Sequence, residues 1–325
     1  MNVKITYHIM PWEIDYVLLT FSQLKKSKYH LPKDINITID SVLNLSSYII
    51  NWEESKMPKE YFIKKYNSLS LLLKDYNHNK KIYQGDELYG HLDLQRDCVG
   101  DFDSYMSICP DMYFSEHLLY YMLESARNIK GENFVITPQT HKLWDASWDV
   151  ITDPDYLETP YKSWDTVDIF DLRNKLKTQD TEISLQPITN NKWAGWFDLY
   201  SKSFYEDLAP IHTDMSGYGP WDWYGMMLMD ISRSYGVDFQ QFLLKGQTIF
   251  EYSVGPLKET NGFSQYYKDM LVLKDTPNQR QIFESRMQQY LDKGIEMIKQ
   301  KSNTLKNSNI RMPGILHSKL NKLNL

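Results

Sequence analysis

The sequence has few cysteines and no long apolar stretch. Only Cys98 and Cys109 occur among the 325 residues, so the chain has no disulfide framework and suits a reducing compartment. No run approaches the roughly 18 apolar residues that a membrane-spanning helix needs. Lys4 and His8 interrupt any apolar core of a secretion signal. These absences predict a cytoplasmic protein without a membrane span.

An excess of positive charge is also missing. The 36 basic and 42 acidic residues give a formal net charge of −6. That balance argues against a general nucleic-acid coat, because such a protein needs a basic footprint. From residue 303 onward, however, the chain carries basic residues and no acidic one. We therefore expect a basic tail over residues 301–325, which either contacts a polyanion or is simply a solvated terminus.

Several familiar motifs are absent. The sequence contains no phosphate-binding P-loop, no Gly-x-Gly-x-x-Gly fingerprint, no Cys-x-x-Cys metal site and no Gly-x-Ser-x-Gly elbow. Internal repeats and low-complexity linkers are missing too. With 42% hydrophobic and 24% charged residues, the composition is that of an ordinary globular protein. A single domain over residues 1–300 is the simplest organisation.

Aromatic residues are abundant instead. They make up 14% of the chain, with 24 Tyr and 9 Trp. Such rings offer apolar area with a polar tip, so they stack on flat ligands or sugar faces. A tyrosine-rich core is the alternative interpretation. The frequent Lys and Asn residues hint at a viral or microbial source.

The first half of the chain alternates between strand-like and helix-like patterns. Residues 3–9 and 35–39 are expected strands, the second ending at Asp40, and apolar positions at helical spacing follow Glu13. Helices are also expected over residues 58–76 and 87–98 and from Ser115, with further strands over 105–108 and over 134–137, where Pro138 stops the strand. This order predicts an α/β fold with a mostly parallel central sheet and helices on both faces. In the second half we expect long loops with a few short elements over residues 139–222, and a late helix over residues 277–301.

Ligands of such sheets bind beyond the carboxyl ends of the strands. Pro11, Asp40 and the Cys109-Pro110-Asp111 sequence each follow a predicted strand. We expect the ligand site at these positions.

The segment over residues 95–114 carries the most specific pattern. An Arg-containing helix, an acidic turn, an apolar strand and then Cys109-Pro110-Asp111 follow one another. This order resembles the central region of GT-A-fold glycosyltransferases, a Rossmann-like family that uses nucleotide-sugar donors. In that family an Asp-x-Asp motif holds a divalent cation, Mn²⁺ or Mg²⁺, on the donor diphosphate. Asp111 matches the second acid, whereas Cys109 replaces the first, and a thiolate is a poor ligand for these hard cations. The resemblance thus implies metal and donor binding by Asp111, helped by water, donor phosphates or another acid.

A second pattern lies over residues 211–223. Gly217 and Gly219 permit tight turns, Tyr218 and Trp221 offer stacking surfaces, and Asp222 follows them. The pattern is similar to the aromatic-Gly-x-acid loop of many inverting GT-A enzymes. That likeness implies that Asp222 is the base that deprotonates the acceptor hydroxyl. Asp222 could equally cap a helix over residues 223–234.

The resemblance implies further site residues. Pro11, Trp12 and Asp40 would contact the base and ribose of the donor, and Arg96 would be a basic residue near the donor. Asp40 could instead cap a turn, and Arg96 could be a surface residue. Residues that would shape the sugar and acceptor pocket are Trp144, Asp145 and Trp148, together with Tyr218 and Trp221. The two tryptophans four residues apart would also suit a buried helix face.

The sequence therefore predicts a glycosyltransferase that moves a sugar from a nucleotide-diphosphate sugar to an acceptor hydroxyl with inversion. The acceptor stays open between a glycan, a small molecule and a modified nucleic acid. One alternative is a non-catalytic nucleotide- or glycan-binding protein of the same fold, which Cys109 favours. Another is a phage-type enzyme that glycosylates modified DNA bases, which the basic tail favours and the net charge disfavours.

Overall fold

A computed structural model gives the fold of the chain. The described residues are 1–14, 16–46, 58–85, 94–95, 97–142, 182–188, 197–208, 229, 232–237, 239–251, 292, 295–296 and 298–300. All structural statements below concern these residues.

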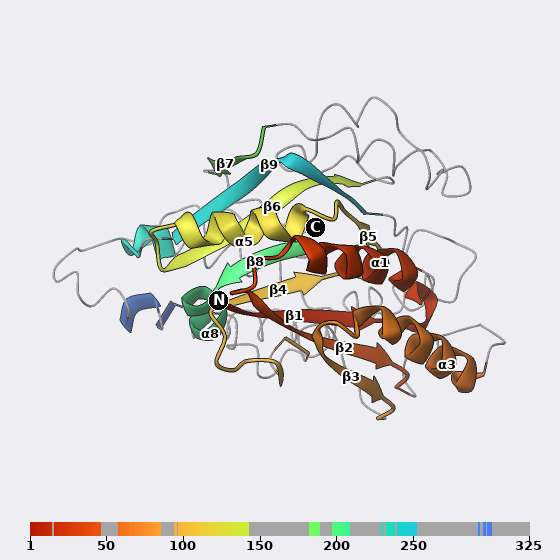
Figure 1. Ribbon diagram of the computed structural model, residues 1–325. Coiled ribbons are helices and arrows are strands. Elements are labelled where there is room, and N and C mark those ends of the chain that lie inside the picture. Colours follow the sequence, from red (N-terminus) through yellow and green to blue (C-terminus); the bar gives the residue numbers. More distant parts are fainter. Residues whose placement is uncertain are drawn as a thin grey trace.

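A single sheet forms the centre of the molecule (Figure 1). Its strands follow one another in the order β3-β2-β1-β4-β8-β6-β9-β5, and β7 pairs with β9. β1, β2, β3 and β4 run parallel, and β8 reverses direction between β4 and β6. β6 and β9 are parallel to each other, while β5 and β7 pair antiparallel with β9. The strand bounds are β1 Asn2–Ile9, β2 Asn36–Asn44, β3 Asn77–Tyr83, β4 Ser104–Ile108, β5 Met112–Tyr113, β6 Asn133–Lys142, β7 Ser184–Pro187, β8 Phe197–Ser201 and β9 Phe239–Glu251. The predicted α/β fold with a mostly parallel central sheet is confirmed.

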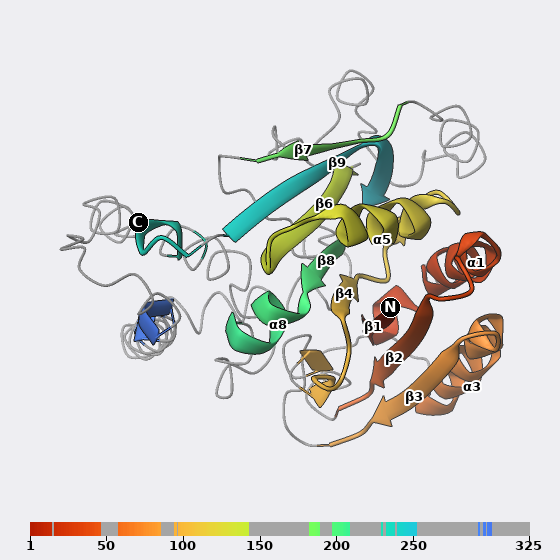
Figure 2. The ribbon, with the colours of Figure 1, turned by 60° about the vertical axis from the view of Figure 1, so that its left-hand side comes forward.

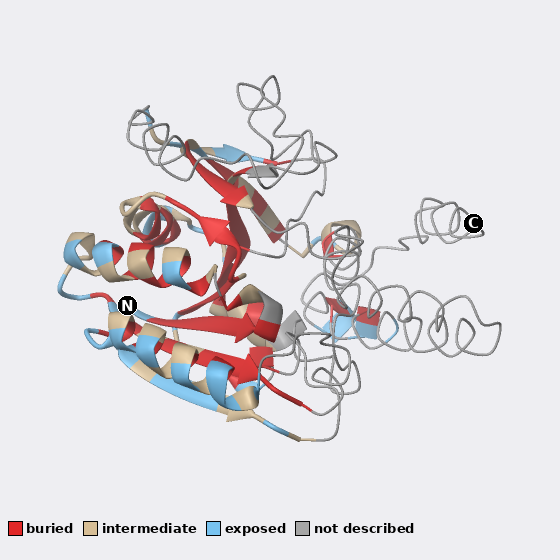
Figure 3. Ribbon diagram, turned by 90° about the vertical axis from the view of Figure 1, so that its right-hand side faces the viewer, coloured by how far each residue is buried: buried red, intermediate tan, exposed pale blue. Residues whose placement is uncertain are grey.

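Three helices lie side by side over one face of this sheet (Figures 1 and 2). They are α1 (Val17–Ser27), α3 (Lys59–Ser70) and α5 (Leu118–Asn128), with the 3₁₀ turns η1 (Pro11–Glu13), η2 (Lys28–His30) and η3 (Leu71–Leu73) at helix ends. The buried apolar residues of α1 recur at the spacing of one helix face, and Leu18 on the other side is exposed. Alternate residues of β1 join the same core, as the period of a strand requires. Figure 3 shows this helix layer on one side of the buried central strands.

The opposite face of the sheet carries another helix, α8 (Lys202–Leu208). Met106 belongs to the core under α1, whereas its neighbour Tyr105 points to the other side of β4. There the ring of Tyr205 in α8 stacks on Tyr105 at a centroid distance of 4.1 Å. The expected placement of helices on both faces is thus confirmed. None of the helices in the described part of the chain combines the length and apolar character needed to cross a membrane.

Two strands are longer than the sequence predicts. β2 continues past Asp40 to Asn44, so the expected strand end at Asp40 is wrong. Lys4 on the neighbouring strand pairs with Asp40, which lets the carboxylate remain within the sheet. The expected stop at Pro138 is also wrong, since β6 continues to Lys142 through a register shift between Pro138 and Gln139. β9 supplies the extra residues of this bulge, and Gly246 adopts a φ of 87° there.

Several strands were not foreseen, among them the long β9 as well as β3 and β8. β3 is an edge strand whose sequence NHNKKIY has mostly exposed or half-exposed side chains and so lacks an apolar alternation. β8 lies within residues 139–222, where long loops were expected, yet all its residues are buried at the centre of the sheet. Of the late helix over 277–301, only residues 292, 295, 296 and 298–300 are described, and they are helical. The division into a domain over 1–300 and a basic tail over 301–325 stays a prediction.

Candidate functional site

The candidate site lies at the carboxyl ends of two adjacent strands. β1 ends at Ile9 and leads into η1, which begins at Pro11. β4 ends at Ile108 and leads into Cys109-Pro110-Asp111. The two strands pair in parallel, with Thr6 opposite Ser107. Both turns therefore leave the sheet at the same edge, and this brings Pro11 close to the Cys109–Asp111 turn, as the sequence predicts.

Helix α1 holds the chain that follows β4. The buried hydroxyl of Thr20 lies 2.6 Å from the carbonyl oxygen of Pro110, to which it donates, and 3.1 Å from that of Met112. One turn later, the side-chain amide of Gln23 donates to the carbonyl oxygen of Phe114. Both side chains lie on the buried side of α1. Residues 110–114 are thus fixed along α1 by polar contacts to their backbone, and Asp111 lies within this segment.

A second acid, Glu13, lies within electrostatic range of Asp111. Asp111 is 5% exposed, and Glu13 is partly buried. The backbone N–H of Met10 donates to a carboxylate oxygen of Glu13 over 2.8 Å, which fixes the acid within η1. Burial, and then the neighbouring negative charge of Asp111, raise the pKa of Glu13 well above its ordinary value. Two carboxyl groups from different loops are therefore close enough to repel each other.

The surroundings of Tyr7 report the same grouping. Tyr7 is fully buried near the end of β1. Burial raises the pKa of its phenol most, and the charges of Asp111, Glu13 and Cys109 raise it further. These three groups therefore all lie within electrostatic reach of one buried ring, at one edge of the sheet.

This arrangement suits a hard divalent cation. A cation between two carboxylates offsets their mutual repulsion, and Mg²⁺ and Mn²⁺ prefer oxygen ligands. Asp111 and Glu13 supply such oxygens, whereas the thiol of Cys109 does not. Glu13 is a candidate for the additional acid that the resemblance leaves open. Its signal was its place in the turn directly after β1, within two residues of Pro11.

Asp40 lies away from this edge, four residues before the end of β2. Its carboxylate pairs with Lys4 Nζ at 2.7 Å and accepts hydrogen bonds from Asn79 Nδ2 at 2.8 Å and from the Cys98 thiol at 3.1 Å. Burial, followed by the charge of Asp40, raises the pKa of Cys98. Asp40 thus has a structural role within the sheet, and its donor-binding role stays a prediction.

The carboxyl end of β2 presents other groups. Asn44 and His8 are both buried, and their side chains approach within 3.3 Å across β1 and β2. The side-chain oxygen of Asn44 also accepts from the N–H of Ser46. This polar pair lies near the carboxyl ends of β1 and β2, and it was not foreseen from the sequence.

The other predicted site residues are only partly described. The backbone of Trp12 lies in η1, next to Glu13. Several predicted residues lie outside the described part of the chain, and their roles stay predictions: Arg96, Trp144, Asp145, Trp148, Tyr218, Trp221 and Asp222.

No family model and no curated protein matches this chain. Among solved structures, it is similar to GalNAc-T7 with UDP, GalNAc and Mn²⁺, at 9% identity and a TM-score of 0.44, covering 77% of this chain and 44% of that one. S. aureus TarS 1-349 in complex with UDP-GlcNAc matches at 8% identity and a TM-score of 0.41, over 95% of this chain and 77% of that chain. A longer S. aureus TarS structure matches at 10% identity and a TM-score of 0.36, over 74% and 40%. Because these TM-scores are below 0.5, the α/β assignment rests on the observed sheet topology.

Proposed function

We propose that this protein is a glycosyltransferase that uses a nucleotide-diphosphate sugar. The observation that carries the proposal is the placement of Glu13 and Asp111 in the turns after β1 and β4, two adjacent parallel strands, within electrostatic range of each other. A diphosphate leaving group develops negative charge during sugar transfer, so it needs a cation held by carboxylates. The motif order of residues 95–114 supports the same reading.

Asp111 and Glu13 would hold Mn²⁺ or Mg²⁺ in this proposal. The cation would supply charge neutralisation on the donor diphosphate as it leaves. Thr20 and Gln23 act through the backbone of residues 110–114, which they keep in place along α1. Pro11 and Trp12, in the turn next to Glu13, would contact the donor nucleotide, and Arg96 would be a basic residue near the donor.

Asp222 is the proposed base. It would take the proton of the acceptor hydroxyl while that oxygen bonds to the anomeric carbon and the bond to the diphosphate breaks. The configuration of the sugar is thereby inverted. Trp144, Asp145, Trp148, Tyr218 and Trp221 would form the sugar and acceptor pocket, because indoles stack on sugar faces and carboxylates bind their hydroxyls. A cytoplasmic location is proposed on the two free cysteines, Cys98 and Cys109.

A non-catalytic nucleotide- or glycan-binding protein is the second candidate. Cys109 favours it, because the first acid of the family's Asp-x-Asp motif is replaced by a thiol. Donor hydrolysis and transfer distinguish the two candidates, since a binding protein would retain the donor unchanged.

Thermal unfolding with UDP-, GDP- and TDP-sugars, with and without Mn²⁺, tests the proposal. We expect one donor to raise the unfolding temperature of the wild type in a Mn²⁺-dependent way. Asp222→Asn should keep this shift and lose transfer, whereas Asp111→Ala should lose the shift. The matched control is Asp101→Ala, because Asp101 belongs to a literal Asp-x-Asp before β4 and its exposed carboxylate pairs with Lys202. If no donor stabilises the wild type, the proposal is wrong.

A further inference from the structure

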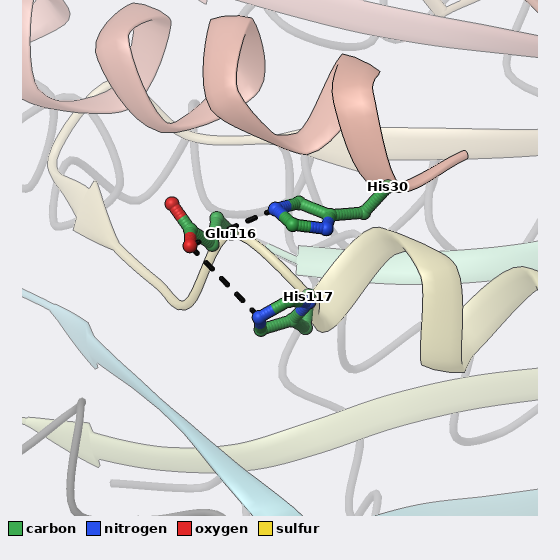
Figure 4. Close-up of side chains that lie close together, drawn as sticks. All are labelled: His30, Glu116 and His117. Carbon is green, nitrogen blue, oxygen red and sulfur yellow. Dashed lines mark ion pairs between the residues drawn. The ribbon is translucent and has the colours of Figure 1, made fainter.

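Two histidines and a glutamate gather on the helix-covered side of the sheet (Figure 4). His30 ends η2, just after α1, and Glu116 and His117 directly precede α5. A carboxylate oxygen of Glu116 lies 3.6 Å from Nε2 of His30 and 3.9 Å from Nε2 of His117. The two imidazole rings lie 4.0 Å apart between centroids. One candidate ligand atom from each residue lies within 4.8 Å of the other two.

These distances are close to those around a bound transition metal. Bonds of about 2.0–2.1 Å to zinc place neighbouring ligand atoms of a tetrahedron about 3.4 Å apart. The two separations from Glu116 exceed this edge by a few tenths of an ångström, and the ligand atoms of the two histidines lie within 4.8 Å of each other. Side-chain rotation can supply the remaining shift. All three side chains are about one third to two fifths exposed, so an ion can reach them from solvent.

The donor set distinguishes this cluster from the site at Asp111 and Glu13. Imidazole nitrogens favour zinc-class cations, whereas sites made of carboxylates favour Mg²⁺ and Mn²⁺. The two places are also apart in the fold. Glu13 precedes α1 and His30 follows it, and the 11 residues of α1 span about 16 Å.

The fold brings the three ligands together through contacts already described. Thr20 and Gln23 hold residues 110–114 along α1, so the chain reaches the C-terminal end of this helix at Glu116 and His117. The N–H of His117 donates to the Ser115 hydroxyl at 3.2 Å, which fixes the start of α5. An ion bound here would connect the end of α1 to the beginning of α5.

We propose that His30, Glu116 and His117 bind one zinc-class divalent cation, with water in the remaining coordination position. The site is independent of the proposed transferase activity. Bound metal joins the two helices and leaves one position open for exchange.

Metal titration of the full-length protein tests this site. After chelator treatment and without nucleotide, we expect one Zn²⁺ to bind in calorimetry and Co²⁺ to give the visible absorption of a tetrahedral complex. His30→Ala, His117→Ala and Glu116→Gln should each weaken binding by about tenfold or more, because even outer-shell changes weaken metal sites by about 10–100-fold. Tyr29→Ala is the control, since Tyr29 is the exposed neighbour of His30.

Tyr29→Ala and Asp111→Asn should keep wild-type Zn²⁺ affinity. Circular dichroism would verify that each variant is folded. Zn²⁺ binding that persists unchanged in a folded His30→Ala/His117→Ala double variant would overturn the proposal, as would a wild type that binds no Zn²⁺. Loss of Zn²⁺ binding in Asp111→Asn alone would place the ion at the donor site and equally overturn it.

Discussion

The hydroxyl of Thr20 is the contact through which α1 holds the turn that carries Asp111. Thr20→Val removes this hydroxyl while keeping the shape and the β-branch of the side chain. The fully buried hydroxyl is then gone, and the carbonyl oxygens of Pro110 and Met112 lose their contact with it. Loss of such a buried partner costs about 1–3 kcal/mol. We expect the free energy of unfolding to fall by this amount.

Urea unfolding and donor titration measure the two consequences. Ser27→Ala is the matched control, because the Ser27 hydroxyl is equally buried in α1 but donates only to the Gln23 carbonyl within the helix. Thr20→Val should lower stability more than Ser27→Ala and should also weaken Mn²⁺-dependent donor binding. Equal stability losses in the two variants, with unchanged donor affinity in both, would refute the role given to Thr20.

Other contacts give further predictions. Lys4→Met leaves the Asp40 carboxylate in the sheet without its cation. Because the side chains of Lys4 and Asp40 are only 7% and 19% exposed, we expect the free energy of unfolding, measured in urea, to fall by about 3–5 kcal/mol. Lys4→Met/Asp40→Asn should recover part of it, and no recovery would show that the charge pair is not the cause. Burial, and then Lys80, lower the pKa of His78. The unfolded chain therefore takes up the proton first, and stability should fall as the pH drops below about 6.5 towards that lowered value. His78→Gln should reduce this slope in unfolding measured against pH, and an unchanged slope would exclude His78 as its source.

The sequence predicted the ends of β1 and β4, because a proline follows each strand closely. Pro11 and Pro110 have no N–H to donate to a neighbouring strand, and each lies where a strand leaves the sheet. The same reasoning failed at Pro138, because a bulge in β9 accommodates that residue within β6. It also failed at Asp40, because its partner Lys4 lies on another strand. A single polar residue does not reveal whether tertiary contacts will neutralise it.

The proximity of Glu13 and Asp111 was beyond sequence reasoning for a similar reason. The two acids lie on loops after β1 and β4, strands that are distant in the chain and adjacent in the sheet. Thr20 and Gln23 show the same limit. They interrupt the apolar side of α1, and only the path of residues 110–114 explains why polar groups lie there.

The affinity of Mn²⁺ for the donor-bound protein is the most direct test of the proposed cation site at Asp111 and Glu13. This affinity is measured by calorimetric titration in the presence of the donor identified by thermal unfolding. The proteins compared are the wild type, Asp111→Asn, Glu13→Gln and the control Asp101→Asn. We expect Asp111→Asn and Glu13→Gln each to weaken Mn²⁺ binding by about tenfold or more, while Asp101→Asn matches the wild type. Wild-type Mn²⁺ affinity in both Asp111→Asn and Glu13→Gln would contradict the proposed site.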